Sequence, residues 1–451
     1  MPEPYELSLT EAVEEIASRR LSAVELMQSI HRRIEKTEPS FQAWATLLFE
    51  ESLSLASKSD KKASGRGALE GVPYGAKDIF DTAGIKTAAG SRIFADRIPG
   101  EDASCIKIAQ EAGAILLGKT HTTEFADGDP APSFNPWNME HTPGGSSTGS
   151  GVAVAARMVP WAFGTQTVGS VLRPAAYNGI VGFKPTFGRI SRLGVIPMAT
   201  SFDHVGFLAR TVDDMALLLN VFAGFDPDDP YSQKMPVDNY LKSIIDVPRS
   251  PTIGLLRGWF FEEADAGTRV SIEETAQKLA KAGAIIEEVD LGIDYPRAYA
   301  AHRLMQESEM ALWHQPLYIE NQNLYGPKIS VYLENGFSHT AMEYVEASEY
   351  RIKVQRLAAS AVKNVDALLM PSVSAPPPKD RTQTGDTRFQ SLWSFTGFPS
   401  ISVPIGLSGE GLPVGAQLSC APFDESKLLR VSKWIEETLG AQLCPPELGN
   451  N

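Results

Sequence analysis

The chain has 451 residues, of which 43% are hydrophobic and 21% charged, a composition typical of a globular protein with a large core. Its formal net charge of −14 at pH 7 argues against nucleic acid as a partner, and no window holds the ~18 uninterrupted apolar residues of a membrane helix. The three cysteines, Cys105, Cys420 and Cys444, lack metal-binding spacing and suit a reducing compartment. The acidic N-terminal stretch lacks the order of a signal peptide. We therefore expect a cytoplasmic protein with no bound metal, whose partners are small molecules or other proteins.

Two helices are expected at the start of the chain. Ser8 with Glu11 and Ser22 with Glu25 each form the pattern of a capping box, in which Ser and Glu stand three residues apart before an apolar-periodic run. Apolar residues then recur at helical spacing over 26–34. That face is expected to pack on the main body of the protein.

After a polar loop predicted at 57–67, strand-like and helical runs alternate along the chain. Such alternation predicts an α/β fold in which helices cover a large, mainly parallel or mixed β-sheet. The segment 296–364 is rich in Tyr, Met, Glu and Leu and is expected to be a helical insertion over that sheet. In chain order, the other runs are AILLGK at 114–119, a small-residue helix at 147–158, IVGF at 180–183, MALLLNVF at 215–222, TIGLL at 252–256, a helix at 270–284, AIIEEVDL at 284–291, DALLMP at 366–371, SISVPI at 400–405, VGAQL at 414–418 and a helix at 425–439.

We expect one domain over 1–451. Its parts are N-terminal helices over 1–65, a core over 71–220 and the helical insertion.

Two glycine-rich runs raise the question of chemistry, TPGGSSTGSG at 142–151 and GTQTVGSVLRP at 164–174. The first run leads straight into an apolar helix, which weakens its interpretation as a linker, and it lacks the motifs of a phosphate-binding loop. The second run offers the Ser170 hydroxyl at the predicted start of a helix, and the backbone N–H groups of 167–170 can converge on one oxygen. None of the seven histidines lies in a recognisable triad context.

PGGSS at 143–147, GTQTVGSVLRPAAYNGIVGFKPT at 164–186 and GVPYGAKD at 71–78 together resemble the amidase signature family. These serine hydrolases use a Ser-cisSer-Lys triad. The resemblance continues through PSVSAPPP and GFPSISVPIGLSGEGLPVGAQL over nearly the whole chain. It implies the amidase signature fold.

The resemblance also implies the triad, with Ser170 as nucleophile, Ser146 as bridge and Lys77 as base. The two serines stand 24 positions apart (170 − 146), the usual spacing in the family. In the family the peptide bond that corresponds to Gly145–Ser146 is cis. Lysine is a useful base near pH 7 only if burial lowers its pKa from about 10.4. Pairing with Asp78 would raise that pKa instead, and the residues alone leave this alternative open.

The backbone N–H groups of Thr167, Val168 and Gly169 are the oxyanion hole that the resemblance implies. The family commonly has Asp and Gly at the positions that Gln166 and Val168 occupy here. Because a β-branched residue resists positive φ, we expect ordinary backbone dihedrals at Val168.

Three residues are predicted to bind substrate. Arg173 stands three positions after the predicted nucleophile, as in the malonamidase branch of the family, whose Arg grips a substrate carboxylate. A bidentate pair with an acidic acyl group and a structural ion pair are both open for it. Trp137 and Trp393 lie near the family's acyl-pocket strands, although tryptophans are more often core residues.

These features predict an amidase that hydrolyses the C–N bond of a small linear amide through a serine acyl-enzyme, without metal or organic cofactor. The acyl group of that amide is open to carrying a carboxylate. Three alternatives stand beside this function: an amidotransferase subunit that releases ammonia to a partner, a carbamate or ester hydrolase of the same family, and an inactive scaffold. The expected partner is a small-molecule amide rather than nucleic acid or membrane, and a homodimer is left open.

Overall fold

The computed structural model describes residues 3–245 and 250–446, so both ends of the predicted domain lie outside the described residues. Within the described residues, eleven strands form one sheet in the order β1-β3-β2-β4-β6-β5-β10-β11-β9-β7-β8. The strands are β1 (Trp44–Leu47), β2 (Pro73–Lys77), β3 (Ile115–Thr120), β4 (Trp161–Gln166), β5 (Val181–Lys184), β6 (His204–Ala209), β7 (Thr252–Leu255), β8 (Ile285–Glu288), β9 (Ala367–Pro371), β10 (Ser400–Leu407) and β11 (Pro413–Ser419).

The sheet is mixed. β2 pairs in parallel with β3 and β4, and β7 pairs in parallel with β8 and β9, whereas the other pairs are antiparallel. The predicted α/β fold with a large mixed sheet is therefore confirmed.

Helices cover the sheet and extend beyond it. The α-helices are α1 (Leu9–Ala17), α2 (Ala23–Phe41), α3 (Phe49–Asp60), α4 (Ser104–Glu111), α5 (Thr148–Ala155), α6 (Leu172–Asn178), α7 (Val212–Phe222), α8 (Tyr240–Ser243), α9 (Gly258–Glu263), α10 (Ala266–Lys281), α11 (Tyr295–Asn321), α12 (Pro327–Ser338), α13 (Ala341–Ala361), α14 (Arg388–Thr396) and α15 (Glu425–Leu439). Short 3₁₀ turns lie at η1 (Pro4–Glu6), η2 (Glu124–Ala126) and η3 (Gln322–Leu324). A search of the described helices finds none with the length and apolar character needed to cross a bilayer.

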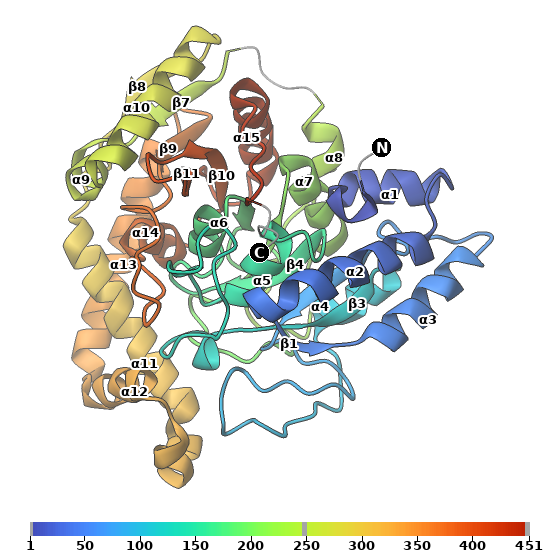
Figure 1. Ribbon diagram of the computed structural model, residues 1–451. Coiled ribbons are helices and arrows are strands. Elements are labelled where there is room, and N and C mark those ends of the chain that lie inside the picture. The colour runs from blue at the N-terminus through green and yellow to red at the C-terminus, as the bar shows by residue number, and fades with distance from the viewer. Residues whose placement is uncertain (1–2, 246–249, 447–451) are drawn as a thin grey trace.

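The two N-terminal helices begin where the sequence predicts. The Ser8 hydroxyl accepts the N–H of Glu11 at the start of α1, and the Ser22 hydroxyl accepts the N–H of Glu25 at the start of α2. Both capping boxes are complete, so two otherwise unsatisfied donors are bonded at each helix start. Figure 1 shows α1, α2 and α3 on one side of the molecule, opposite α11, α12 and α13.

The segment predicted as a helical insertion is helical. α11, α12 and α13 fill most of 296–364, with a break at η3 near the predicted interruption. α11 packs on α12, α13 and α14, so the three helices form a column beside the sheet (Figure 1). This column brings residues around 299–332 close to the end of β4.

Three parts of the fold differ from the sequence prediction. α3 continues to Asp60, so the loop predicted at 57–67 begins later than expected. The prediction did not include β4, because its six residues are all buried and show no alternation of polar and apolar residues. It also did not include α14, every residue of which from Phe389 to Thr396 is buried, so that no polar face marks it as a helix.

An aromatic cluster joins the two strands that matter most for the site. The ring of Tyr74 in β2 stacks on Trp161 in β4 with 4.8 Å between centroids, and Phe163 packs edge-on against Tyr74 at 5.7 Å. Stacked and edge-on pairs at these distances are favourable beyond their buried area. The cluster therefore fixes β2 against β4 just before both strands end.

Gly149 sets how closely α5 approaches the sheet, and this closeness predicts a stability effect. A Cβ atom at Gly149 would lie 2.1 Å from the carbonyl oxygen of Ala43 and 2.5 Å from the backbone nitrogen of His121. Because neither backbone atom can move freely, we expect Gly149→Ala to lower the free energy of unfolding by about 1–3 kcal/mol.

Urea unfolding measures this change. The matched control is Gly267→Ala in α10, where the nearest atom would lie 3.9 Å away. We expect that variant to unfold at the wild-type midpoint or to gain up to ~1 kcal/mol. Equal effects at the two glycines would contradict the close approach of α5.

Candidate active site

Lys77 is the last residue of β2 and is completely buried. Its Nζ lies 2.8 Å from Ser146 Oγ and 2.8 Å from Thr165 Oγ1. Parallel pairing of Ala76 with Phe163 places the carboxyl ends of β2 and β4 side by side, which brings Thr165 to the lysine. The sheet therefore holds the amine between two hydroxyl groups.

Burial lowers the pKa of Lys77 well below its ordinary value of 10.5. The nearby Asp203 carboxylate opposes this shift and Arg173 adds to it. Asp78, the alternative partner considered from the sequence, instead lies 3.6 Å from the buried Nζ of Lys119 and accepts a backbone N–H at 3.0 Å. Within the described residues, Lys77 forms no ion pair.

Ser146 lies in the turn that precedes α5. The Gly145–Ser146 peptide bond is cis, as the resemblance implied, and Gly144 before it has a φ of +78°, a region that favours glycine. The hydroxyl of the adjacent Ser147 bonds both the N–H and the carbonyl oxygen of Thr165, each at 3.2 Å. Ser147 therefore ties the turn to β4, while Ser146 faces Lys77.

Ser170 lies in the turn between β4 and α6. The helix begins at Leu172, two residues later than the sequence predicts. The carbonyl oxygen of Ser170 accepts the N–H of Ser147 at 3.3 Å, which joins the two glycine-rich runs. Ser146 and Ser170 both line one cavity of about 370 Å³. The structure thus brings the three predicted triad residues together.

The backbone between β4 and Ser170 has unused donors. In the described part of the chain, the N–H groups of Thr167, Val168 and Gly169 have no hydrogen-bond partner. Val168 lines the cavity, and it is absent from the seven non-glycine residues with positive φ among those described. Its backbone dihedrals are therefore ordinary, as expected for a β-branched residue.

Arg173 is buried and is used mainly by the backbone. Its Nε and Nη2 donate to the carbonyl oxygen of Gly145 at 3.2 and 2.6 Å, and its Nη1 donates to that of Gly385 at 2.6 Å. The structural ion pair considered from the sequence is absent from the described residues, because the partners of Arg173 are carbonyl groups. Two of the five guanidinium N–H groups remain for the cavity that Arg173 lines.

The same cavity contains charged and phenolic groups that the sequence analysis did not identify. Asp127 accepts a bond from Gln306 at 2.9 Å and lies 3.6 Å from Arg303. Lys328 donates to the carbonyl oxygen of Thr382. The cavity wall also includes Tyr299 and Tyr332 from the helical column. No local motif marks these residues, since they come from segments far apart in the sequence.

The two predicted tryptophans lie elsewhere. Trp393 is fully buried in a hydrophobic cluster with its Nε1 directed at the sulfur of Met370 at 3.1 Å. Trp137 donates from Nε1 to the carbonyl oxygen of Asn178 at 2.9 Å. Neither residue is part of the cavity wall, so their positions give no support to a substrate contact.

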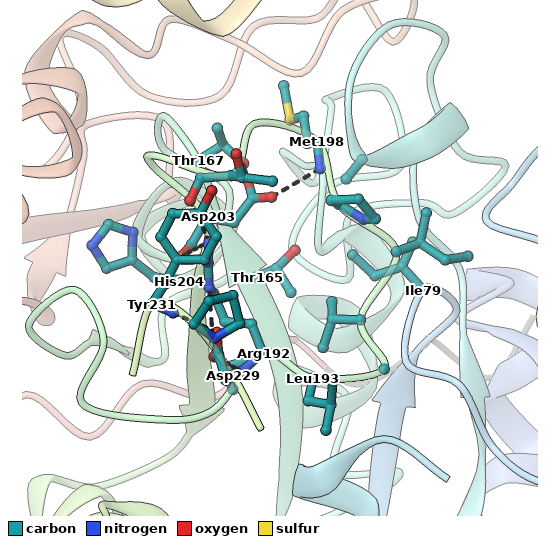
Figure 2. A pocket seen from close by; sticks show the side chains of 18 residues that line it. Ile79, Thr165, Thr167, Arg192, Leu193, Met198, Asp203, His204, Asp229 and Tyr231 are labelled. Carbon is teal, nitrogen blue, oxygen red and sulfur yellow. Dashed lines mark hydrogen bonds and ion pairs between the residues drawn. The ribbon is translucent and has the colours of Figure 1, made fainter. Parts of the chain in front are cut away.

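A second cavity of about 240 Å³ adjoins the first and shares Ala126 and Met198 with it. Figure 2 shows Thr165, Thr167 and Asp203 on its wall, with Asp203 bonded to the N–H of Met198 at 2.9 Å. The Thr167 hydroxyl donates to Asp203 at 2.5 Å. The second cavity therefore borders the residues that contact Lys77 and the turn before Ser170.

Comparisons with known proteins agree with this arrangement. A family model described as Amidase matches residues 25–429. One of the glutamyl-tRNA(Gln) amidotransferase subunits of Carboxydothermus hydrogenoformans is 36% identical over 99% of this chain and 100% of that protein.

Two solved structures show the same fold. The native peptide amidase from Stenotrophomonas maltophilia is similar with a TM-score of 0.86 and 30% identity over 99% of each chain. A chain from a vestigial protein complex connected with the origins of an s-triazine catabolic enzyme has a TM-score of 0.90 and 29% identity, over 96% of this chain and 98% of that one. Because the family model and these relatives span nearly the whole sequence, the chain belongs to the amidase family.

Proposed function

We propose that this protein cleaves the C–N bond of an amide by nucleophilic attack of Ser170. The observation that carries the proposal is the buried amine of Lys77, held 2.8 Å from the hydroxyl of Ser146 in a cavity that also exposes Ser170. A serine hydroxyl needs a base to remove its proton, and a buried amine with a lowered pKa is a suitable one.

In the proposed reaction, neutral Lys77 takes a proton from Ser146 as Ser146 takes one from Ser170. The Ser170 oxygen bonds the carbonyl carbon, and the N–H groups of the 167–169 turn stabilise the oxyanion. When the C–N bond breaks, the relay returns the proton to the leaving amine. Water then attacks the acyl-enzyme with the same relay, which releases the acid and restores Ser170.

The charges of the cavity favour a polar acyl group. Among the described residues, neither Lys328 nor Arg173 forms an ion pair with a carboxylate, and both line the cavity. A substrate carboxylate gains charge-assisted hydrogen bonds from such cations. Asp127 offers a partner for a cationic or amide group on the same substrate.

A second candidate is the ammonia-releasing subunit of an amidotransferase. It is favoured by the curated relatives, which are 32–36% identical over nearly the whole chain and are named as subunits of glutamyl-tRNA(Gln) amidotransferase. The same Ser170 chemistry would release ammonia to a partner protein in place of bulk water. Carbamate and ester hydrolysis also use this chemistry and differ only in the leaving group.

The first prediction concerns the nucleophile. A fluorophosphonate probe is expected to label the wild-type protein at Ser170, and Ser170→Ala is expected to lose both labelling and amide hydrolysis, the latter by at least ~10³-fold. Intact-mass spectrometry and ammonia release measure the two effects. Thr396→Val, which removes a buried hydroxyl bonded only within α14, is the control and should label normally. Labelling that persists in Ser170→Ala would overturn the assignment.

The second prediction concerns Lys77 and pH. Between its lowered folded-state pKa and 10.5, the unfolded chain holds a proton on this lysine that the folded chain lacks, so stability rises with pH across that window. Lys77→Met removes this uptake of a proton on unfolding.

The variant is therefore expected to lose activity and to gain about 2 °C in Tm at pH 7, with a smaller gain at pH 10. Scanning calorimetry at both pH values measures the difference. A Tm that falls equally at both values would show that Lys77 is not held neutral.

The third prediction concerns substrate. We expect the kcat/KM for malonamate to exceed that for propionamide by about tenfold, the value of one charge-assisted hydrogen bond. Lys328→Met should remove most of this preference and leave propionamide hydrolysis nearly unchanged. Lys379→Met is the control, because this lysine is 70% exposed. Equal hydrolysis of the two amides would exclude carboxylate recognition.

L-Glutamine in the same assay separates the two candidate functions. Rapid ammonia release by the purified chain alone supports a free-standing hydrolase. Slow release that becomes faster when a partner protein is added supports the amidotransferase function.

A further inference from the structure

One hydroxyl group on α14 contacts both residues at which the turn before Ser170 departs from the common family pattern. Gln166 Nε2 donates to Ser394 Oγ at 3.1 Å, and Ser394 Oγ donates to the carbonyl oxygen of Val168 at 2.8 Å. Gln166 and Ser394 are fully buried. Buried polar groups that are all bonded fix one arrangement, because breaking any bond leaves an unsatisfied group.

The other end of the Gln166 side chain holds the start of α6. Its Oε1 accepts the N–H of Val171 at 2.9 Å and that of Leu172 at 3.0 Å. One amide therefore links the first turn of α6 to α14, and Ser170 lies within the segment that these bonds enclose. The glutamine satisfies backbone donors on one side and the α14 hydroxyl on the other.

The bond to Val168 also sets the direction of a neighbouring donor. The carbonyl of Val168 and the N–H of Gly169 belong to one planar trans peptide, so they point in opposite directions. Holding the carbonyl toward α14 turns the Gly169 N–H away from α14. Gly169 itself has close packing on this side, since a Cβ there would lie 2.6 Å from Oε1 of Gln390, another α14 residue.

We infer that Ser394 and Gln166 are a pair of positioning residues that aim the Gly169 N–H at the developing oxyanion on the substrate. This inference rests on the proposed function, since it gives the turn a role in the Ser170 reaction. The pair replaces the shorter Asp common in the family with a longer amide that reaches a short hydroxyl. Neither residue touches the reacting atoms, so both act through the backbone of the turn.

The test uses the full chain and the fluorophosphonate probe, whose phosphoryl oxygen occupies the oxyanion position after reaction with serine. Saturation kinetics of labelling separate the binding constant of the probe from the maximal rate at Ser170. We expect Ser394→Ala to lower the maximal rate by about tenfold or more with little change in probe binding, because a misaimed donor loses part of the effect of an oxyanion-hole bond. Ser394→Thr keeps the hydroxyl and should stay within about threefold of wild type.

Thr396→Val is the matched control, since it deletes a buried hydroxyl on the same helix that contacts only α14. We expect its labelling rate to stay within about twofold of wild type, even where its Tm falls as much as that of Ser394→Ala. A general loosening of α14 would slow labelling in both variants and would overturn the inference.

An exchange of lengths keeps the test independent of whether Ser394→Ala folds. Gln166→Asp shortens one side chain and Ser394→Asn lengthens the other and restores an amide donor. Each single change should slow labelling, and the double variant should recover at least about tenfold over the slower single variant, which is the non-additivity of contacting residues.

The outcomes separate the positioning pair from the function of Ser170. Wild-type maximal rates in Ser394→Ala, or additive effects in the double variant, would overturn the positioning pair while Ser170 remains the labelled residue. Absence of labelling in the wild-type protein would instead overturn the proposed function.

Discussion

The burial of one amine is the constraint on which the rest of this site depends. Lys77 lies in the interior with its Nζ bonded to two hydroxyl groups, and the described residues provide no carboxylate partner within ion-pair distance. A charged ammonium in such a place is costly, so the neutral amine is favoured and its pKa falls. The condition that makes this residue a potential base is thus the same one that lowers the stability of the fold near neutral pH.

The sheet creates that condition by packing rather than by local sequence. β2 is buried along its whole length between β3 and β4, and the stack of Tyr74 on Trp161 seals its approach to the end where Lys77 lies. α5 covers the same strands at a distance that only glycine permits at position 149. Parallel strands end at the same edge, which is why a lysine from one and a threonine from the other meet there.

The contacts of Arg173 and of the 167–169 turn show how a family pattern can hold while its details change. Arg173 uses three donors on the carbonyl groups of Gly145 and Gly385, so any role in substrate binding falls to its remaining N–H groups. Val168 keeps ordinary dihedrals, and its carbonyl group is held by a hydroxyl from α14. The cations and phenols of the cavity, by comparison, come from the helical column beside the sheet.

The sequence by itself determined the features that depend on neighbours along the chain. Capping boxes at Ser8 and Ser22, the mixed α/β pattern and the spacing of the serine and lysine motifs are local, so each can be recognised without knowledge of the fold. Only the tertiary structure decided that Asp78 pairs with Lys119, and that the wall of the site contains Lys328. These outcomes depend on segments tens to hundreds of residues apart, whose contacts follow from strand order and helix packing. The buried strand β4 and the buried helix α14 escaped sequence prediction for a related reason, because burial on all sides removes the periodic pattern that reveals an element at a surface.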